Sequence, residues 1–138
     1  MSYLLDTNIV SEARKPNGDA NVKAWLGSVS GRDLHMSVLV IGEVRSGIER
    51  LRRRNPAEGA VYELWLATLL RDYADRIVPV TAAIAEDWGR LNATRTLPAV
   101  DGLLAATARV MGLTLVTRNE RDFAGISISI LNPFEPAV

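Results

Sequence analysis

Short apolar runs alternate with longer amphipathic segments along almost the whole chain. A short apolar run predicts a buried strand, and a longer segment with an apolar residue every three or four positions predicts a helix. The predicted strands are Tyr3–Leu5, Leu34–Ser37, Ile77–Val80, Thr114–Thr117 and Ile126–Leu131. The predicted helices are Asn8–Arg14, Ala20–Ser28, Val38–Arg54, Ala57–Tyr73, Ala82–Arg95 and Gly102–Met111.

This alternation is typical of an α/β fold, in which helices cover both faces of a sheet. We therefore expect three layers around a mainly parallel, twisted sheet of four to five strands. With 138 residues and no interdomain linker, residues 1–138 are expected to form a single domain with one core.

Two of the predicted helices have distinctive apolar surfaces. Gly102–Met111 is apolar nearly all round, so it is expected to be central and well buried. Ala57–Tyr73 carries two apolar stripes, and two explanations stay open: one stripe needs a partner chain, or both are buried within the monomer. The stripes are Val61, Leu64, Trp65 and Thr68, and Tyr62, Leu66, Leu69 and Tyr73.

The composition excludes several kinds of chemistry. There is no cysteine, so disulfides, thiolate zinc sites and cysteine nucleophiles are excluded. The single histidine, His35, lies in a predicted strand, which makes multi-histidine metal sites and Ser-His-Asp catalysis poor candidates. No apolar stretch approaches the roughly 20 residues of a membrane span, and no signal sequence begins the chain. We expect a cytoplasmic protein that has no contact with a membrane.

Four acidic residues stand at comparable points of the predicted fold. Asp6 directly follows the first strand, and open α/β sheets bind ligands at the carboxyl ends of their strands. Glu43 lies beside apolar neighbours on its helix and is expected to be partly enclosed. Asp101 precedes Gly102–Met111, and Asp122 follows the fourth strand.

Each acidic residue also has a purely structural explanation. Asp6 and Asp101 could cap helices, Glu43 could pair with an arginine, and Asp122 could be a solvated loop residue. Several carboxylates gathered at one sheet edge would repel one another unless they were protonated or neutralised by a divalent ion. Oxygen ligands favour Mg²⁺ or Mn²⁺, and such an ion activates water for the hydrolysis of phosphate esters.

Four segments carry a resemblance to a known family. The chain resembles the PIN-domain family, specifically the VapC-like toxins of bacterial toxin–antitoxin pairs and, within these, the FitB-like group. The resemblance extends from the first strand to Phe134. The segments that carry it are Leu4–Glu12, Ser37–Gly47, Asp101–Ala108 and Leu115–Phe123.

The resemblance implies a role for each matching residue. Asp6, Glu43 and Asp101 match the three acidic positions that build the PIN metal site, and Thr7 and Asn8 match the polar residues beside the first aspartate. The fourth acidic position of many relatives aligns with Asn119, which could supply a carbonyl oxygen or hold a metal-bound water. Asp122, three residues further on, could supply the missing carboxylate and a catalytic role.

The implied activity is that of a toxic, metal-dependent endoribonuclease that cuts cellular RNA until a small antitoxin blocks it. The family also implies a homodimer and a larger toxin–antitoxin assembly that binds operator DNA through the antitoxin. The net charge is zero, so RNA would be held by a local patch. Arg118 and Arg121 flank Asn119 and are the candidate phosphate contacts for single-stranded RNA.

Two alternatives remain at this stage. A haloacid-dehalogenase-like phosphatase also begins with a strand that ends in aspartate, but it needs a second aspartate where this chain has Asn8 and a lysine late in the chain. A non-catalytic PIN-like module would bind RNA or protein through a degenerate acidic site. The intact set of Asp6, Glu43 and Asp101 argues against that module.

Overall fold

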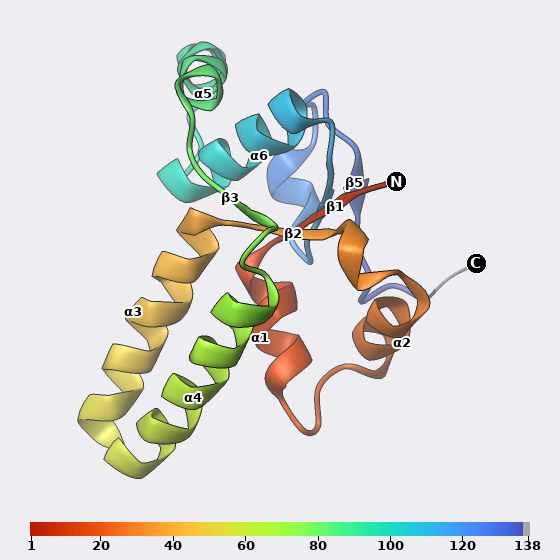
Figure 1. The fold of residues 1–138 in the computed structure, drawn as a ribbon. Coiled ribbons are helices and arrows are strands. Elements are labelled where there is room, and N and C mark those ends of the chain that lie inside the picture. Colours follow the sequence, from red (N-terminus) through yellow and green to blue (C-terminus); the bar gives the residue numbers. More distant parts are fainter. Residues whose placement is uncertain (137–138) are drawn as a thin grey trace.

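The fold, a computed structural model that describes residues 1–136, is built on a five-stranded sheet (Figure 1). The strand order is β3-β2-β1-β4-β5, and every neighbouring pair is parallel, as predicted. The strands are β1 (Tyr3–Leu5), β2 (Leu34–Ser37), β3 (Ile77–Val78), β4 (Thr114–Val116) and β5 (Ile130–Leu131).

Helices cover both faces of this sheet. In Figure 1, α1, α3 and α4 lie on one side of the strands, and α5 and α6 lie on the other, which confirms the predicted three layers. Within residues 1–136, no helix is long and apolar enough to cross a membrane. The helices are α1 (Thr7–Arg14), α2 (Ala20–Ser28), α3 (Val38–Arg54), α4 (Pro56–Asp72), α5 (Ala82–Thr94) and α6 (Ala99–Met111), with short 3-10 helices η1 (Gly31–Asp33) and η2 (Glu120–Phe123).

The strand order places a topological switch point between β1 and β4. The chain adds β2 and β3 on one side of β1 and then returns to add β4 and β5 on the other. In open α/β sheets, ligands bind at the carboxyl end of such a point. The register pairs Leu5 with Val116, so the next residues, Asp6 and Thr117, lie side by side at this edge. The Asp6 amide donates to the Val116 carbonyl over 2.9 Å.

The central position of α6 follows from its small and apolar side chains. Leu104, Ala105 and Ala106 are fully buried, and only the last turn exposes Val110 and Met111. This burial confirms the central position predicted for the helix. α6 ends just before β4 begins, so its last turn lies at the amino edge of the sheet and its first turn lies towards the carboxyl edge. The tight packing holds the first turn in that place.

Three predicted boundaries were wrong by two residues or more, each for a local reason. α6 begins at Ala99 because the fixed φ of Pro98 suits the residue before a helix, so Asp101 lies in the first turn and does not cap it. β3 ends at Val78 because Pro79 has no amide hydrogen for a strand ladder. β5 begins only at Ile130, because Gly125 adopts a left-handed conformation (φ 84°) and the residues after it form bends.

The two stripes of α4 have different surroundings. The stripe that contains Tyr62 and Leu66 packs against the main core. Val61 and Leu64, in the other stripe, are 62% and 73% exposed. Burial of both stripes within the monomer was therefore a wrong alternative. An exposed apolar face remains on α4, and the predicted homodimer stays a prediction.

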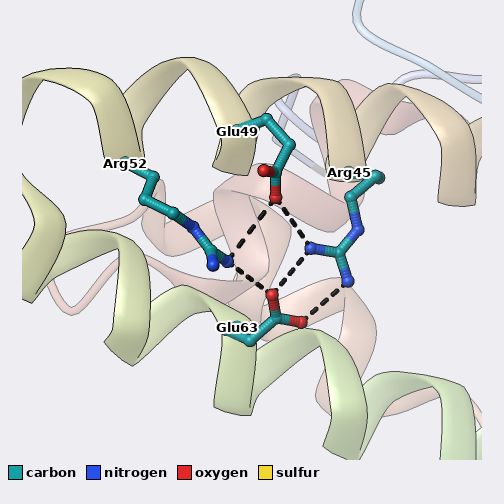
Figure 2. A network of polar contacts seen from close by, with 4 residues as sticks. All are labelled: Arg45, Glu49, Arg52 and Glu63. Atoms are coloured by element: carbon teal, nitrogen blue, oxygen red, sulfur yellow. Dashed lines mark hydrogen bonds and ion pairs between the residues drawn. The ribbon is translucent and has the colours of Figure 1, made fainter.

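Charged side chains join α3 to α4 on their solvent side (Figure 2). Both terminal nitrogens of Arg45 contact Glu63 at 2.7 Å, and Arg52 contacts the same carboxylate. Glu49 accepts from Arg45 at 3.0 Å and lies 3.5 Å from Arg52. Hydrogen bonds from Arg45 and Arg52 lower the pKa of Glu63 to about 2. The stabilisation of the fold by these contacts of Glu63 is therefore present above its ordinary pKa of 4.5 and is lost as the pH falls through about 2.

The two helices also approach each other closely at their shared end. Asn55 caps both helices. Its backbone amide caps the end of α3, and its side-chain oxygen caps the start of α4 by accepting from the Glu58 amide at 3.1 Å. A Cβ added at Gly59 would lie 2.9 Å from the Arg52 Cα. Only glycine therefore allows this helix–helix contact without a backbone shift.

We predict that Gly59→Ala destabilises the protein by about 1–3 kcal/mol, since the added methyl group forces α3 and α4 apart. The measurement is the free energy of unfolding in urea. Gly89→Ala in α5 is the matched control, because nothing lies within 4 Å of its added Cβ. That control is expected to gain about 0.5–1 kcal/mol from the helix preference of alanine. Equal effects of the two substitutions would contradict this account.

Candidate functional site

Asp6 is fixed by hydrogen bonds from both strands of the switch point. Its side chain is only 6% exposed. One carboxylate oxygen accepts from the Thr7 amide at 2.7 Å, which caps α1, and the other accepts from the Thr117 hydroxyl at 2.7 Å. The Asn8 side-chain amide lies 3.4 Å from that second oxygen. Capping, the structural role considered for Asp6, is thus present together with its place at the sheet edge.

Burial sets the protonation behaviour of this carboxylate. Loss of solvent raises the pKa of Asp6 above its ordinary value of 3.8, although the hydrogen bonds from Thr117 and Thr7 act in the opposite direction. The charge of Glu43 raises the pKa of Asp6 further. A nearby positive charge would therefore favour the ionised form of Asp6, which burial and Glu43 disfavour.

Glu43 reaches the same edge from α3, which begins directly after β2. The Thr7 hydroxyl donates to the Glu43 carboxylate at 2.5 Å, so the residue after Asp6 holds the second acid. Glu43 is exposed, and the prediction of partial enclosure was wrong. Gly47, its neighbour one turn further along α3, has no side chain to cover it. Among the described residues, Glu43 forms no ion pair with an arginine.

Asp101 enters the site from the first turn of α6. Burial is the main cause of its raised pKa, and the charges of Asp6, Asp122 and Glu43 raise it further. A Cβ at the next residue, Gly102, would lie 2.9 Å from two atoms of the Trp88 indole. The glycine thus lets α6 pack directly against α5, and that contact sets the position of Asp101.

Asp122 lies in η2, the short helix after β4. Its carboxylate is exposed, yet its charge acts on Asp101. Arg95, which follows α5, holds this segment by donating to the carbonyl of Asp122 at 2.7 Å and to the carbonyl of Ala124. The backbone amide of Asn119 donates to the Thr117 hydroxyl at 3.1 Å. The Asn119 side chain is exposed.

The structure therefore brings four predicted acids to one edge of the sheet: Asp6, Glu43, Asp101 and Asp122. Thr7 and Asn8 support Asp6 and Glu43, as described above. Arg118 and Arg121 lie on the adjacent loop, where they line a hollow that also contains Asn119 and Asp122. Asn119 thus lies beside the acids, but no hydrogen bond within residues 1–136 joins its side chain to them.

Thr117 and Arg95 are site residues that sequence reasoning missed. Thr117 is fully buried and contacts Asp6, Asn119 and Asn8 through one hydroxyl group. The sequence signal was its position at the end of a strand, which gains meaning only once β4 is known to lie beside β1. Arg95 carried no signal, because it contacts main-chain carbonyls about 30 residues away.

The residues at this edge fit a hard divalent cation in their chemistry. The donors are carboxylate, hydroxyl and amide oxygens, which Mg²⁺ and Mn²⁺ prefer. Within residues 1–136, no three acidic or histidine side chains are gathered closely enough to hold an ion in the present arrangement. Glu43 points to the Thr7 hydroxyl, and the mutual repulsion among the acids raises the pKa of Asp101. An ion would replace that repulsion with attraction.

Comparison with known proteins shows which family the chain is similar to. The family model for the PIN domain matches residues 3–128. Toxin FitB of Neisseria gonorrhoeae is 29% identical, and the match covers 95% of this chain and 97% of the relative. VapC ribonuclease Y4jK of Sinorhizobium fredii is 30% identical, with 97% and 99% covered. A solved structure of FitAB bound to a DNA fragment matches with a TM-score of 0.89 at 28% identity, covering 99% of this chain and 98% of that one.

Asp101→Asn is expected to stabilise the metal-free protein at pH 7 by about 0.5–2 kcal/mol, because it removes a charge that burial and three neighbouring acids disfavour. The pKa of Asp101 is raised on folding, so wild-type stability falls as the pH rises through the folded pKa. The gain should therefore shrink as the pH falls towards 3.8.

Urea unfolding in EDTA between pH 3 and pH 8 tests this expectation. Glu86→Gln, at an exposed acidic position on α5, is the matched control and should show no such pH-dependent gain. A variant that is less stable than the wild type at pH 7, or a gain that does not change with pH, would contradict the assignment.

Proposed function

The chain belongs to the PIN-domain family, and we propose that it is the toxin of a type II toxin–antitoxin pair, a metal-dependent endoribonuclease. The observation that carries this proposal is the meeting of Asp6, Glu43, Asp101 and Asp122 at the topological switch point of the sheet. Relatives that match over nearly their whole length are named as a toxin and as a ribonuclease. We place its action in the cytoplasm, where cellular RNA is available.

Asp6, Glu43 and Asp101 are the proposed metal ligands. Asp6 needs little movement, because the Thr7 amide and the Thr117 hydroxyl already fix both of its oxygens. Thr7 holds Glu43 beside it. A bound Mg²⁺ or Mn²⁺ would supply an activated water and stabilise the charge that develops on the phosphate. The repulsion that raises the pKa of Asp101 supports a divalent ion at this place.

Asn119 and Asp122 form the part of the site that follows β4. We propose that Asp122 provides the catalytic carboxylate there, because its charge already acts on Asp101 while the Arg95 guanidinium holds its backbone. Asn119 is the proposed additional ligand through its side-chain oxygen. Arg118 and Arg121 on the same loop are the proposed contacts for RNA phosphates.

A small antitoxin is the proposed inhibitor of this activity. FitB is named as a toxin, and the FitAB structure with the same fold was solved with a DNA fragment. We propose that this chain likewise joins an operator-bound assembly, with the antitoxin making the DNA contacts. The exposed Val61 and Leu64 of α4 offer an apolar surface for a second copy, which supports the proposed homodimer.

One observation favours the non-catalytic PIN-like module as a second candidate. The acids are not gathered into a closed metal cluster within residues 1–136. The family resemblance also implies an acid at the position of Asn119. The haloacid-dehalogenase alternative has no such support, because the PIN-domain model spans residues 3–128. The experiments below separate an enzyme from a binding module.

Purified protein is expected to cut single-stranded RNA in Mg²⁺ or Mn²⁺ and to stop in EDTA. Asp6→Asn and Asp101→Asn should each lower kcat by about 100-fold or more, because each removes a charge that holds the ion. Glu86→Gln controls for the loss of a carboxylate elsewhere. Cleavage that persists in EDTA, or that survives both aspartate substitutions, would rule out the mechanism.

Mn²⁺ is also expected to raise the melting temperature, since an ion that binds only the folded state stabilises it by about 2.7 kcal/mol at 100 times its Kd. Differential scanning fluorimetry of EDTA-treated protein measures this without activity. The shift should be largely lost in Asp101→Asn and retained in Glu86→Gln. An equal shift in both variants would place the ion elsewhere.

A further inference from the structure

Two neighbouring hollows lie between the loop after β4 and α2. The first has a volume of about 450 Å³ and lies between the loop 118–122 and the segment that contains Asn132, Phe134 and Glu135. The second has a volume of about 390 Å³ and lies between α2 and residues 131–136. Asn132 and Glu135 line both hollows, so the two lie next to each other on either side of the segment that follows β5, and the pair is here called the C-terminal groove.

This groove reaches the acidic site at its inner end. Asp122, one of the four acids of the site, lies in the wall of the first hollow. At the outer end, α2 and the segment that follows β5 lie side by side in Figure 1. A chain that leaves the site along the groove would therefore pass the loop 118–122 first and the face of α2 second.

The walls of the groove are fixed by hydrogen bonds. The Asn21 side chain on α2 donates to the Phe134 carbonyl at 3.0 Å. The Phe134 amide donates to the Asn132 side chain at 3.0 Å, and Pro133 between them is buried. These contacts hold the turn after β5 against α2, so the groove is present before any ligand binds.

The two hollows differ in chemistry. Arg118 and Arg121 line the first, and no described acidic residue forms an ion pair with either guanidinium. Glu120, Asp122 and Glu135 also line it, so anion contacts there depend on the two arginines. The Arg118 guanidinium carbon lies 4.7 Å from the centre of the Phe134 ring, which keeps the side chain ordered.

The second hollow is mainly apolar and has an aromatic wall. Trp25 lines it together with Leu131 and Pro133. The Trp25 ring contacts Tyr3 in an edge-to-face arrangement, with the ring centres 5.0 Å apart, so the indole is held in place. A partly exposed indole in one hollow and arginines in the neighbouring hollow are groups that single-stranded nucleic acid can use together, since bases stack on aromatic rings and phosphates pair with cations.

We propose that unpaired nucleotides next to the scissile phosphate lie in the C-terminal groove, with phosphates at Arg118 and Arg121 and a base in the hollow beside Trp25. This inference rests on the proposed ribonuclease function and extends it, because it assigns a base-binding subsite outside the acidic centre. It favours single strands, since a base paired within a duplex is not free to enter the hollow.

The test compares two RNAs that share the cleaved bond: one of about 4 nucleotides, confined to the acidic centre, and one of about 12, long enough to fill the groove. Ala24→Glu adds a negative charge at an exposed position that lines the second hollow. Trp25→Ala removes the ring, and Trp25→Phe restores an aromatic face if Trp25→Ala folds poorly. Ala85→Glu, exposed on α5, is the matched control.

We expect Ala24→Glu and Trp25→Ala to raise KM for the long RNA by about tenfold, in line with the loss of one stacked base. Their kcat, and both constants for the short RNA, should stay at the wild-type value. Trp25→Phe should recover most of the affinity, and Ala85→Glu should match the wild type. Pairing the flanking nucleotides with a complementary strand should give wild-type protein the KM of the variants.

Three results would overturn the proposal. One is an unchanged KM for the long RNA in Ala24→Glu and Trp25→Ala, which leaves the ribonuclease function intact. Another is an unchanged KM together with an altered oligomeric state of Ala24→Glu in light scattering, which would assign the groove to a second copy of the chain. Failure to cut either RNA would remove the proposed function and this inference with it.

Discussion

The burial of the Asp6 carboxylate between β1 and β4 is the constraint on which the rest of the site depends. A carboxylate taken out of water raises the free energy of the fold unless its oxygens are bonded. The Thr7 amide and the Thr117 hydroxyl provide these bonds, and the same two residues then hold Glu43 and the Asn119 backbone. The positions of the other groups thus follow from the way in which one charge is accommodated.

Local patterns were sufficient for most of the fold. The bounds of β2, α2 and α3 match the predicted residues, because apolar periodicity and capping residues such as Asp19 and Ser37 act within a few positions. The start of β5 could not be predicted in this way. The isoleucines of residues 126–130 look like a strand, but the preceding Gly125 turns the chain and only the end of the segment pairs with β4. The exposure of Glu43 likewise depends on a neighbour that lacks a side chain.

The candidate site was predictable to the extent that its residues carry a chemical type and a place in a motif. Asp6, Glu43, Asp101 and Asp122 have both, and they meet in the structure. Thr117 lies in a matching segment but carries no charge, and Arg95 lies outside all four segments. Their roles arise from one hydroxyl and one guanidinium that contact partners from other elements. Trp25 could be read from the sequence only as a core residue. Its place beside the segment after β5 is what turns it into the wall of a groove.

The neighbouring positions of β1 and β4 also bear on the order of events during synthesis. Thr117 is made 111 residues after Asp6, and the partner strand of β1 on this side does not exist until then. A ribosome-bound chain that ends before β4 lacks the hydroxyl that fixes Asp6. Because pairing between segments so far apart in the sequence forms late, Asp6 gains its hydrogen bond from Thr117 only after most of the chain has been made. A product truncated before β4 would leave that carboxylate oxygen without this bond and β1 without its partner strand on this side.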